Sequence, residues 1–244
     1  MLSDLFDGAL AYLQNLSQIR KYGLGKYLLL SGGIGLAVAL LIGFGIYLYS
    51  DNLGKILATL WKWEWGSGWI TKITSGLSFV VMAGLFYFLF RYIMFVILGP
   101  ILSLMSMRIE KHQFGVAESD TASWLKDMMR GMAVALRNIV WELVLTLAVI
   151  ILGFVLPIFS WAIPILILCI QGYYAGFGNM DYTMERYYSV RSSAQFVKSH
   201  RFFALGNGLV FIFILLIPIL GIFLAPFLGT LAATSPTLKR IQLH

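Results

Sequence analysis

The sequence predicts an all-α integral membrane protein with two long transmembrane helices plus helical hairpins, some of which penetrate the bilayer only partway. Its residues are 59% hydrophobic and 12% charged, whereas a soluble domain is about 45–50% apolar and about 25% charged. Long runs without any charge alternate with short basic segments. No Ser/Gly/Pro-rich linker divides the chain, so we expect residues 1–244 to form a single membrane domain.

The first segment, residues 1–26, is expected to be an interfacial amphipathic helix followed by a basic lead-in. Apolar residues recur there at helical spacing, which is typical of a helix lying on the membrane surface: Leu2, Leu5, Phe6, Ala9, Leu13 and Leu16. Asp4 and Asp7 stand where a cleaved signal peptide would carry basic residues, so we expect the mature chain to begin here.

Residues 27–107 are expected to form the first membrane helices. The charge-free run at 27–50 is long enough to cross a hydrocarbon core of about 30 Å once. Within it, small residues four positions apart predict a smooth stripe for close helix packing: Ser31, Gly35, Ala39 and Gly43.

Two later charge-free runs, at 143–180 and 202–238, are each nearly long enough for two passes, with nothing left over for a turn. Each has two prolines near its middle, Pro157 with Pro164 and Pro218 with Pro226. This pattern predicts two helical hairpins. Because backbone groups freed at a hairpin tip need partners, we expect the tips to be buried against protein or to line a wet cavity.

Lys and Arg gather on one side of this arrangement, which predicts that both termini of this multi-pass membrane protein lie in the cytoplasm. The expected order after residue 107 is a cytoplasmic turn (108–121), the second long helix and its return (122–180), a basic cytoplasmic segment (181–201), the Pro-containing hairpin (202–238) and a cytoplasmic tail (239–244). Basic segments beside apolar runs fit anionic membrane lipids as partners and give no support for nucleic acid.

Charges reappear abruptly at "NMDYTMERYY", residues 179–188. We interpret this stretch as a solvated helix end, with Glu185 and Arg186 facing lipid headgroups. Ser192 and Gln195 have capping-box spacing, which predicts that a short amphipathic helix follows. That helix leads into a cytoplasmic basic cluster that could attract anions: Lys198, His200 and Arg201.

The stretches "GYYAGFGNMDYTMERYYSV" and "FVKSHRFFALGNGLVFIFILLIPILGIFLAPFLGTLAAT" closely resemble the C-terminal half of the CysZ sulfate permease family, also called the etoposide-induced-protein domain family. The resemblance extends back through "LGPILSLMSMRIEKHQFG" and "WLKDMMRGMAVALRNIVWEL". It implies a bacterial inner-membrane protein that assembles as a homodimer or higher homo-oligomer. The implied role is uptake of sulfate for cysteine synthesis.

The resemblance also implies an anion-binding motif before the first membrane helix. Family members carry a Gly-Leu-Arg stretch there, and this chain has "YGLGKY", in which Gly23 and Leu24 match, Gly25 replaces the arginine and Lys26 follows. Lysine is a point charge and selects sulfate geometry less well than the planar fork of arginine. The alternative interpretation is a helix boundary with a membrane-proximal lysine.

Three charged residues, Arg91, Arg137 and Glu142, fall at similar depth when heights are counted from a turn at residues 112–115. Ionisable groups within a bilayer are costly, so they are candidates for function. We hypothesise that Arg91 and Arg137 form a basic site along an anion path, with Glu142 compensating one arginine. The alternatives are a structural ion pair, or Arg91 reaching to an interface.

The sequence predicts no enzyme, no cofactor and no metal site. His112, His200 and His244 lack the spacing of ligands, Cys169 is alone, and no motif of nucleophilic catalysis is present. Two functions remain open. The first is a transporter or channel for sulfate or a related small oxyanion. The second is a membrane-organising or regulatory homo-oligomer of the same fold that does not transport sulfate.

Overall fold

The computed structural model describes residues 2–60, 90–91, 93–94, 96–115, 124–217 and 220–242. Regular structure within these ranges is helical, with no strand among them. Three stretches of the described helices are long and apolar enough to cross a membrane: Gly25–Gly45, Met129–Val155 and Ser160–Met184. The predicted all-α membrane fold is therefore confirmed. Most of the apolar run at 73–90 lies outside the described residues.

Helices α1 (Leu2–Asn15) and α2 (Ser17–Lys21) form the N-terminal segment. The protein-facing side of α1 packs on α9 and α10 and buries Gly8, Ala11, Tyr12 and Asn15. The apolar stripe expected at the membrane surface points the other way, and its members Leu2, Phe6, Leu13 and Leu16 are exposed. This division leaves an apolar face free for lipid while a small-residue face holds α1 to the protein.

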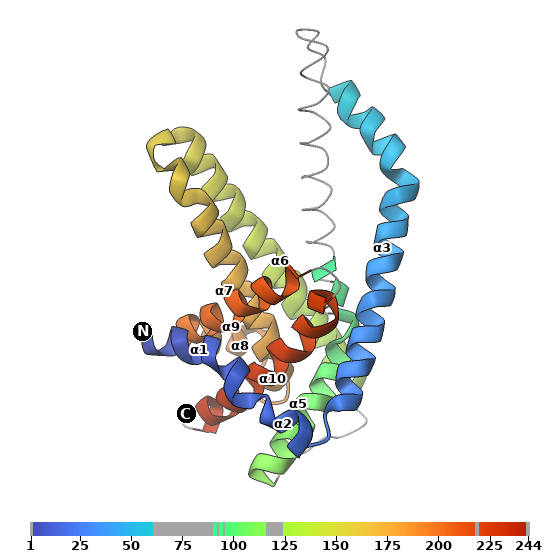
Figure 1. Ribbon diagram of the computed structural model, residues 1–244. Helices are drawn as coiled ribbons and strands as arrows, with labels where there is room; N and C mark the ends of the chain where they lie inside the picture. Colours follow the sequence, from blue (N-terminus) through green and yellow to red (C-terminus); the bar gives the residue numbers. More distant parts are fainter. Residues whose placement is uncertain are drawn as a thin grey trace.

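Helix α3 (Gly25–Leu60) has 36 residues, about 54 Å of helix, and rises along one edge of the molecule (Figure 1). Three members of its small-residue stripe are buried, namely Ser31, Gly35 and Ala39, and Gly43 is half-buried. Since α3 contacts α10 and α5, the prediction that this stripe serves helix packing is confirmed.

Helix α5 (Gly99–Phe114) ends at Gly115, whose φ of 76° makes the left-handed cap that only glycine adopts cheaply. The helix therefore extends into the range 108–121, which was expected to be a turn. Residues 116–123 lie outside the described part of the chain.

Helices α6 (Trp124–Val155) and α7 (Ile163–Met184) form the first predicted hairpin, joined by the 3₁₀ turn η2 (Pro157–Ala162). Figure 1 shows this hairpin reaching away from the rest of the chain. Its tip is exposed, with Phe154 at 82% and Trp161 at 73%. The expectation that this tip is buried against protein is wrong for the single chain, because the 3₁₀ turn gives the backbone its own hydrogen bonds. The alternative, that the tip lines a wet cavity, stays a prediction.

Helix α8 (Val190–Ser199) is the predicted short amphipathic helix. Its N-cap is Ser189, whose hydroxyl accepts a hydrogen bond from the backbone N–H of Ser192 at 3.2 Å. The expected cap at Ser192 is wrong by three residues, because Ser192 already lies inside the first turn.

Helices α9 (Arg201–Leu215) and α10 (Leu220–Gln242) form the second predicted hairpin. The 15 residues of α9 make about 22 Å of helix, which is less than the ~30 Å of a hydrocarbon core. Helix α10 has 23 residues, about 35 Å of helix, so how far this hairpin enters a bilayer stays a prediction.

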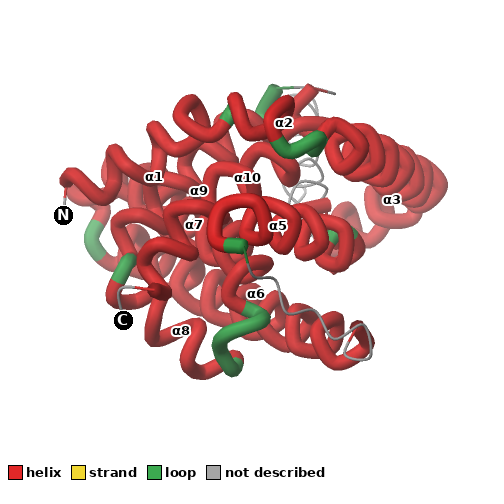
Figure 2. The backbone as a smooth tube through the Cα atoms, turned by 90° about the horizontal axis from the view of Figure 1, so that it is seen from below, coloured by secondary structure: helices red, strands yellow, loops and turns green. Residues whose placement is uncertain are grey.

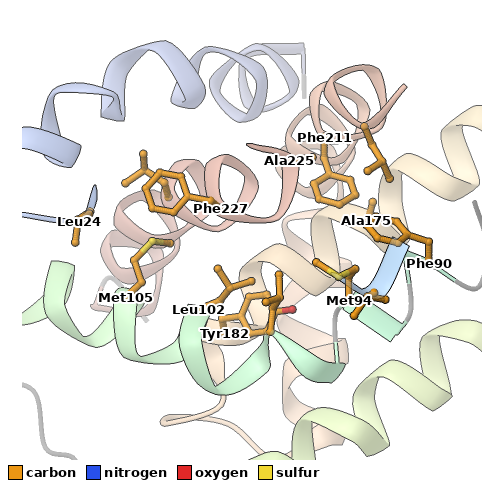
Figure 3. Packing of buried hydrophobic residues seen from close by; sticks show 14 of the residues in the cluster. Leu24, Phe90, Met94, Leu102, Met105, Ala175, Tyr182, Phe211, Ala225 and Phe227 are labelled. Atoms are coloured by element: carbon orange, nitrogen blue, oxygen red, sulfur yellow. The ribbon is translucent and has the colours of Figure 1, made fainter. Parts of the chain in front are cut away.

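The centre of the fold is the stack of α1, α9 and α7, which lie side by side when seen from below (Figure 2). Glycines allow this approach. A Cβ on Gly176 of α7 would stand 1.8 Å from the carbonyl oxygen of Ala204 on α9, and one on Gly206 would stand 2.0 Å from that of Leu5 on α1. Around the stack, apolar side chains of α3, α5 and α10 complete the core (Figure 3).

Candidate functional site

The anion motif lies in the turn between α2 and α3. Leu24 is fully buried and joins Met105 and Phe227 in the core, so it anchors the turn (Figure 3). Gly23 has a φ of 63°, a left-handed conformation that favours glycine. Lys26 is exposed, with its Nζ 5.0 Å from the ring centre of Tyr27.

Helix α3 begins at Gly25, directly after this turn. The first N–H groups of a helix have no acceptor inside it, and the helix dipole makes that end positive. The backbone at Gly25 and the Lys26 side chain therefore present positive potential at the same point. The predicted anion motif has the geometry of a helix N-terminus held in place by the buried Leu24.

A guanidinium from another helix lies beside the same turn. Arg108 of α5 donates from Nε to the carbonyl oxygen of Tyr22 at 2.7 Å, and one of its terminal nitrogens is 3.6 Å from where a Cβ on Gly23 would be. Within the described part of the chain, no hydrogen bond or ion pair engages its two terminal nitrogens. Sequence reasoning missed Arg108 because it is far from Gly23 in the chain, and the only signal was its place in a basic segment.

Arg91 and Glu142 meet, as the depth argument predicted. A terminal nitrogen of Arg91 donates to both carboxylate oxygens of Glu142, and the two side chains are 1% and 3% exposed. This is the structural ion pair that stood as the alternative to a functional site. It links the segment at residues 90–94 to α6.

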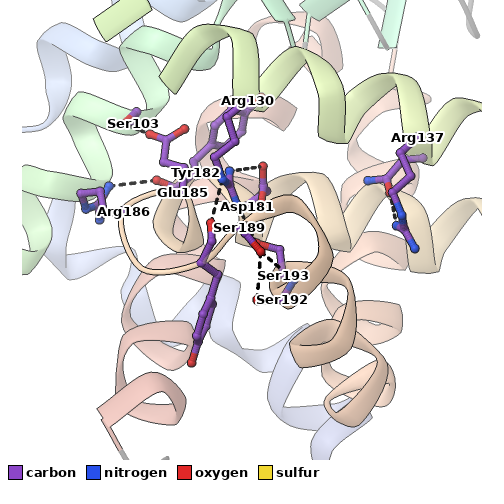
Figure 4. A network of polar contacts seen from close by, with 12 residues as sticks. Ser103, Arg130, Arg137, Asp181, Tyr182, Glu185, Arg186, Ser189, Ser192 and Ser193 are labelled. Carbon is purple, nitrogen blue, oxygen red and sulfur yellow. Dashed lines mark hydrogen bonds and ion pairs between the residues drawn. The ribbon is translucent and has the colours of Figure 1, made fainter. Parts of the chain in front are cut away.

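Arg137 has different neighbours, although it lies on the same helix as Glu142. Its guanidinium donates to Asn138 Oδ1 at 3.4 Å, and its Cζ is 5.9 Å from the ring centre of Phe177. Figure 4 shows it apart from the network around Asp181. It is half-buried, and no carboxylate of the described residues forms an ion pair with it. With respect to the described residues, Arg137 is therefore a cation without a paired acid in the span Met129–Val155.

Arg130 is the centre of a group of polar contacts that we call the Arg130 cluster: Arg130, Asp181, Tyr188 and Ser193. Figure 4 shows Arg130 with Asp181 and Ser193. The two terminal nitrogens of Arg130 on α6 donate to the two carboxylate oxygens of Asp181, each at 3.1 Å. Arg130 also donates to Ser193 Oγ at 2.6 Å and to the carbonyl oxygen of Tyr188 at 2.8 Å. One arginine thus ties α6 to α7, to α8 and to the turn between them.

Arg186 is the centre of a second cluster, the Arg186 cluster: Arg186, Glu110, Ser106 and Tyr187. Arg186 donates to Glu110 Oε2 at 2.8 Å and 3.1 Å and to Ser106 Oγ at 2.9 Å. The hydroxyl of Tyr187 donates to the same glutamate. This cluster joins the end of α7 to α5.

The two clusters explain the abrupt charges at residues 179–188. The interpretation of a solvated helix end is wrong for Asp181 and Arg186, because their side chains are only 7% and 11% exposed and each is held in an ion pair. Three charges within six residues, directly after a long uncharged run, could have indicated that these charges are paired inside the protein. The partners could not be inferred, since they come from other helices.

Glu185 lies between the two clusters and accepts a hydrogen bond from the hydroxyl of Ser103 (Figure 4). Burial raises the pKa of Glu185 to about 7. Ser103 lowers this pKa, the nearby charge of Asp181 raises it, and Arg186 and Arg130 lower it. Near neutral pH, Glu185 therefore exchanges a proton at the junction of α5, α6 and α7.

We expect Glu185→Gln to abolish a pH dependence of stability. Between about pH 4.5 and about pH 7 the folded protein keeps a proton that the unfolded chain releases, so its stability falls as pH rises through this window. The variant should gain about 2 kcal/mol on the wild type between pH 5 and pH 8, allowing for the partial exposure of the group. Thermal unfolding in detergent at several pH values measures this gain.

The control for this experiment is Asp7→Asn, which removes an exposed carboxylate of α1. It should follow the wild type across the series. A constant difference between Glu185→Gln and the wild type at every pH would contradict the assignment.

The basic cluster lies at the junction of α8 and α9. His200 donates from Nδ1 to the carbonyl oxygen of Phe196 at 2.9 Å, and its ring is 4.4 Å from that of Phe196, so it is oriented by its own helix. Lys198 and Arg201 are exposed. The structure brings these three side chains to one end of the molecule, and their role in attracting anions stays a prediction.

No group of three or more His, Cys, Asp or Glu among the described residues is placed to hold a metal ion. No curated protein matches the chain significantly. The family described as "Sulfate transporter CysZ/Etoposide-induced protein 2.4" matches residues 11–226, from α1 to α10 and including the anion motif. Because this match covers most of the chain, the protein belongs to that family, EI24.

Proposed function

We propose that this protein is a transporter or channel for sulfate, or a related small oxyanion, in a bacterial inner membrane. It supplies sulfate for cysteine synthesis, has both termini in the cytoplasm and works as a homo-oligomer. Family membership supports the substrate class. The observation that carries the proposal is the meeting of Arg108 with the anion motif at the start of α3.

This site fits the chemistry of a tetrahedral dianion. Helix N-termini bind such anions through their backbone N–H groups, and a guanidinium can hold two of their oxygens at once. The motif has Gly25 where the family has an arginine, and Arg108 of α5 supplies a planar guanidinium in its place. Lys26 adds a second, exposed charge at the entrance.

The intramembrane charges divide into two roles. Arg91 is neutralised by Glu142 and holds helices together. Arg137 keeps its charge without an ion pair among the described residues, so it is the better candidate for contact with a passing anion. Lys198 and Arg201, exposed at the junction of α8 and α9, raise the local concentration of anions by long-range attraction.

We expect Arg108→Gln to reduce sulfate uptake by about 10- to 100-fold, because hydrogen bonds to charged groups contribute about 1.5–3 kcal/mol each. Arg108→Lys should give an intermediate rate, since it keeps the charge and loses the fork. The measurement is uptake of radiolabelled sulfate into proteoliposomes, compared with empty liposomes.

The matched control is Arg191→Gln, which removes an exposed arginine of α8 and should leave uptake unchanged. Isothermal titration of the same preparations with sulfate measures binding separately from uptake. It therefore distinguishes a variant that no longer binds sulfate from one that binds sulfate but no longer passes it through the membrane. Wild-type uptake by a folded Arg108→Gln protein would exclude Arg108 from the site.

The alternative function is a membrane-organising or regulatory homo-oligomer of the same fold. Three arginines are committed to ion pairs that join helices, namely Arg91, Arg130 and Arg186, and this favours a structural use of charge. A folded, oligomeric wild-type protein that shows no sulfate uptake above empty liposomes would favour this alternative.

A further inference from the structure

A polar cavity of about 390 Å³ opens at the end of the molecule where α2, the last turn of α5 and the last part of α10 meet. Tyr22, which directly precedes the anion motif in the chain, forms part of the cavity wall. The carbonyl oxygen of Tyr22 accepts the hydrogen bond from Arg108. The ring centre of Tyr22 lies 4.9 Å from that of His112 in the cavity wall. The cavity is within the size range of small-molecule sites, about 300–1,000 Å³.

The wall carries cationic side chains and, among the described residues, no carboxylate. Lys21 of α2 and Lys239 of α10 both line the cavity and are both exposed. The Nζ of Lys21 lies 5.5 Å from the ring centre of Tyr22. His112 donates from Nδ1 to the carbonyl oxygen of Arg108 at 2.8 Å, which leaves its Nε2 for a ligand. Two ammonium groups without a competing acid favour an anionic group such as phosphate.

Neutral polar groups line the inner part of the cavity. The amide nitrogens of Gln18 and Gln113 donate to Ser235 Oγ at 3.1 Å and 2.8 Å, so one hydroxyl holds both amides in place. The buried Oε1 of Gln113 has no hydrogen-bond partner within the described part of the chain. Leaving a buried acceptor without a donor costs about 1–3 kcal/mol. A ligand that brings a hydroxyl would remove this cost.

Two exposed leucines of the N-terminal segment lie close in the chain to a residue of the cavity wall. Asn15 of α1 is part of the cavity wall. Its neighbours Leu13 and Leu16 are exposed by 70% and 43%, on the face of α1 that points away from the protein. Apolar chains lying along these leucines would place a polar headgroup at the cavity opening.

We propose that this cavity binds a glycerophosphoryl group. The phosphate lies between Lys21 and Lys239, and a glycerol hydroxyl donates to Gln113 Oε1. The group can belong to an anionic phospholipid of the surrounding leaflet or to a free glycerol phosphate. This site goes beyond the proposed sulfate transport, because it uses neither the Arg108 guanidinium nor Lys26.

The test is binding to the purified full-length protein in a neutral detergent. The probes are sn-glycerol 3-phosphate, inorganic phosphate and dioleoylphosphatidylglycerol, with dioleoylphosphatidylcholine as the neutral lipid. Microscale thermophoresis measures the soluble probes, and native mass spectrometry counts bound lipids. We expect Lys21→Gln/Lys239→Gln to weaken binding of the preferred probe at least 10-fold. The control is Arg191→Gln, which removes an exposed charge from α8 and should keep wild-type affinity.

The pattern of binding identifies the source of the ligand. Binding of phosphatidylglycerol alone supports a lipid ligand, and binding of glycerol 3-phosphate alone supports a soluble one. The role of Gln113 is tested by Gln113→Met, which should bring the affinity for glycerol 3-phosphate down to that for inorganic phosphate. The proposal is overturned if neither glycerol-containing probe binds the wild type, if the wild type prefers inorganic phosphate, or if the double lysine variant binds as the wild type does.

Discussion

Arg91→Met is expected to destabilise the protein by about 3–5 kcal/mol, the usual cost of removing one partner from a buried ion pair. Arg91 is 1% exposed and its guanidinium holds both carboxylate oxygens of Glu142, so the variant takes away the charge that neutralises a buried acid. The expected result is a large fall in melting temperature in detergent and loss of the monodisperse species on size-exclusion chromatography.

The double variant Arg91→Met/Glu142→Met should recover most of this stability. Replacing both members of a buried ion pair by apolar residues of similar size is often neutral or stabilising. Recovery would show that the pair holds helices together. A double variant that loses as much stability as Arg91→Met and Glu142→Met lose together would contradict this, because the two effects would then be independent.

Arg137→Met is the matched control for this series. It removes an arginine from the same helix as Glu142, but one that is half-buried and without an ion pair among the described residues. The fold should therefore keep its melting temperature. If Arg137→Met melts as early as Arg91→Met, the division of the two arginines into different roles is wrong.

The depth argument from sequence succeeded for Arg91 and Glu142 because the rise along a helix fixes the height of a residue. It could not fix direction around the helix. Arg137 precedes Glu142 by five positions, which turns it by about 140° around α6 at 3.6 residues per turn. Two residues at similar height therefore face different neighbours, and the sequence alone grouped them together.

The hairpins were predictable because their signals are local: an uncharged run of double length with prolines at its middle. The Arg130 and Arg186 clusters were not, since each joins side chains from helices far apart in the sequence. The exposed tip at Phe154 and Trp161 was misjudged for another reason. The prediction assumed an irregular turn, and the chain instead forms a 3₁₀ helix there that satisfies its own backbone.

Gly208→Ala is expected to have the second large effect, a loss of more than about 3 kcal/mol, the upper part of the range for overpacked cores. A Cβ at Gly208 would stand 1.7 Å from the carbonyl oxygen of Gly172 and 2.5 Å from the backbone nitrogen of Gly176. Both neighbours are backbone atoms of α7, so no side chain can move aside. Helix α9 would have to separate from α7, and α1, which packs on α9, would follow it.

The matched control is Gly33→Ala on α3. Gly33 is exposed, and a Cβ there would meet nothing within 4 Å. Because alanine favours the helix by about 1 kcal/mol over glycine, this variant should melt at the same temperature as the wild type or slightly higher. Both changes add one methyl group to a helix, so a difference in melting temperature between the two variants reports the steric contact at Gly208 and not the helix preference of alanine. Equal melting temperatures for Gly208→Ala and Gly33→Ala would mean that α7 and α9 are not held at backbone contact. The contact with α9 would then not explain why the end of α7, with Asp181 and the Arg130 cluster, lies where it does.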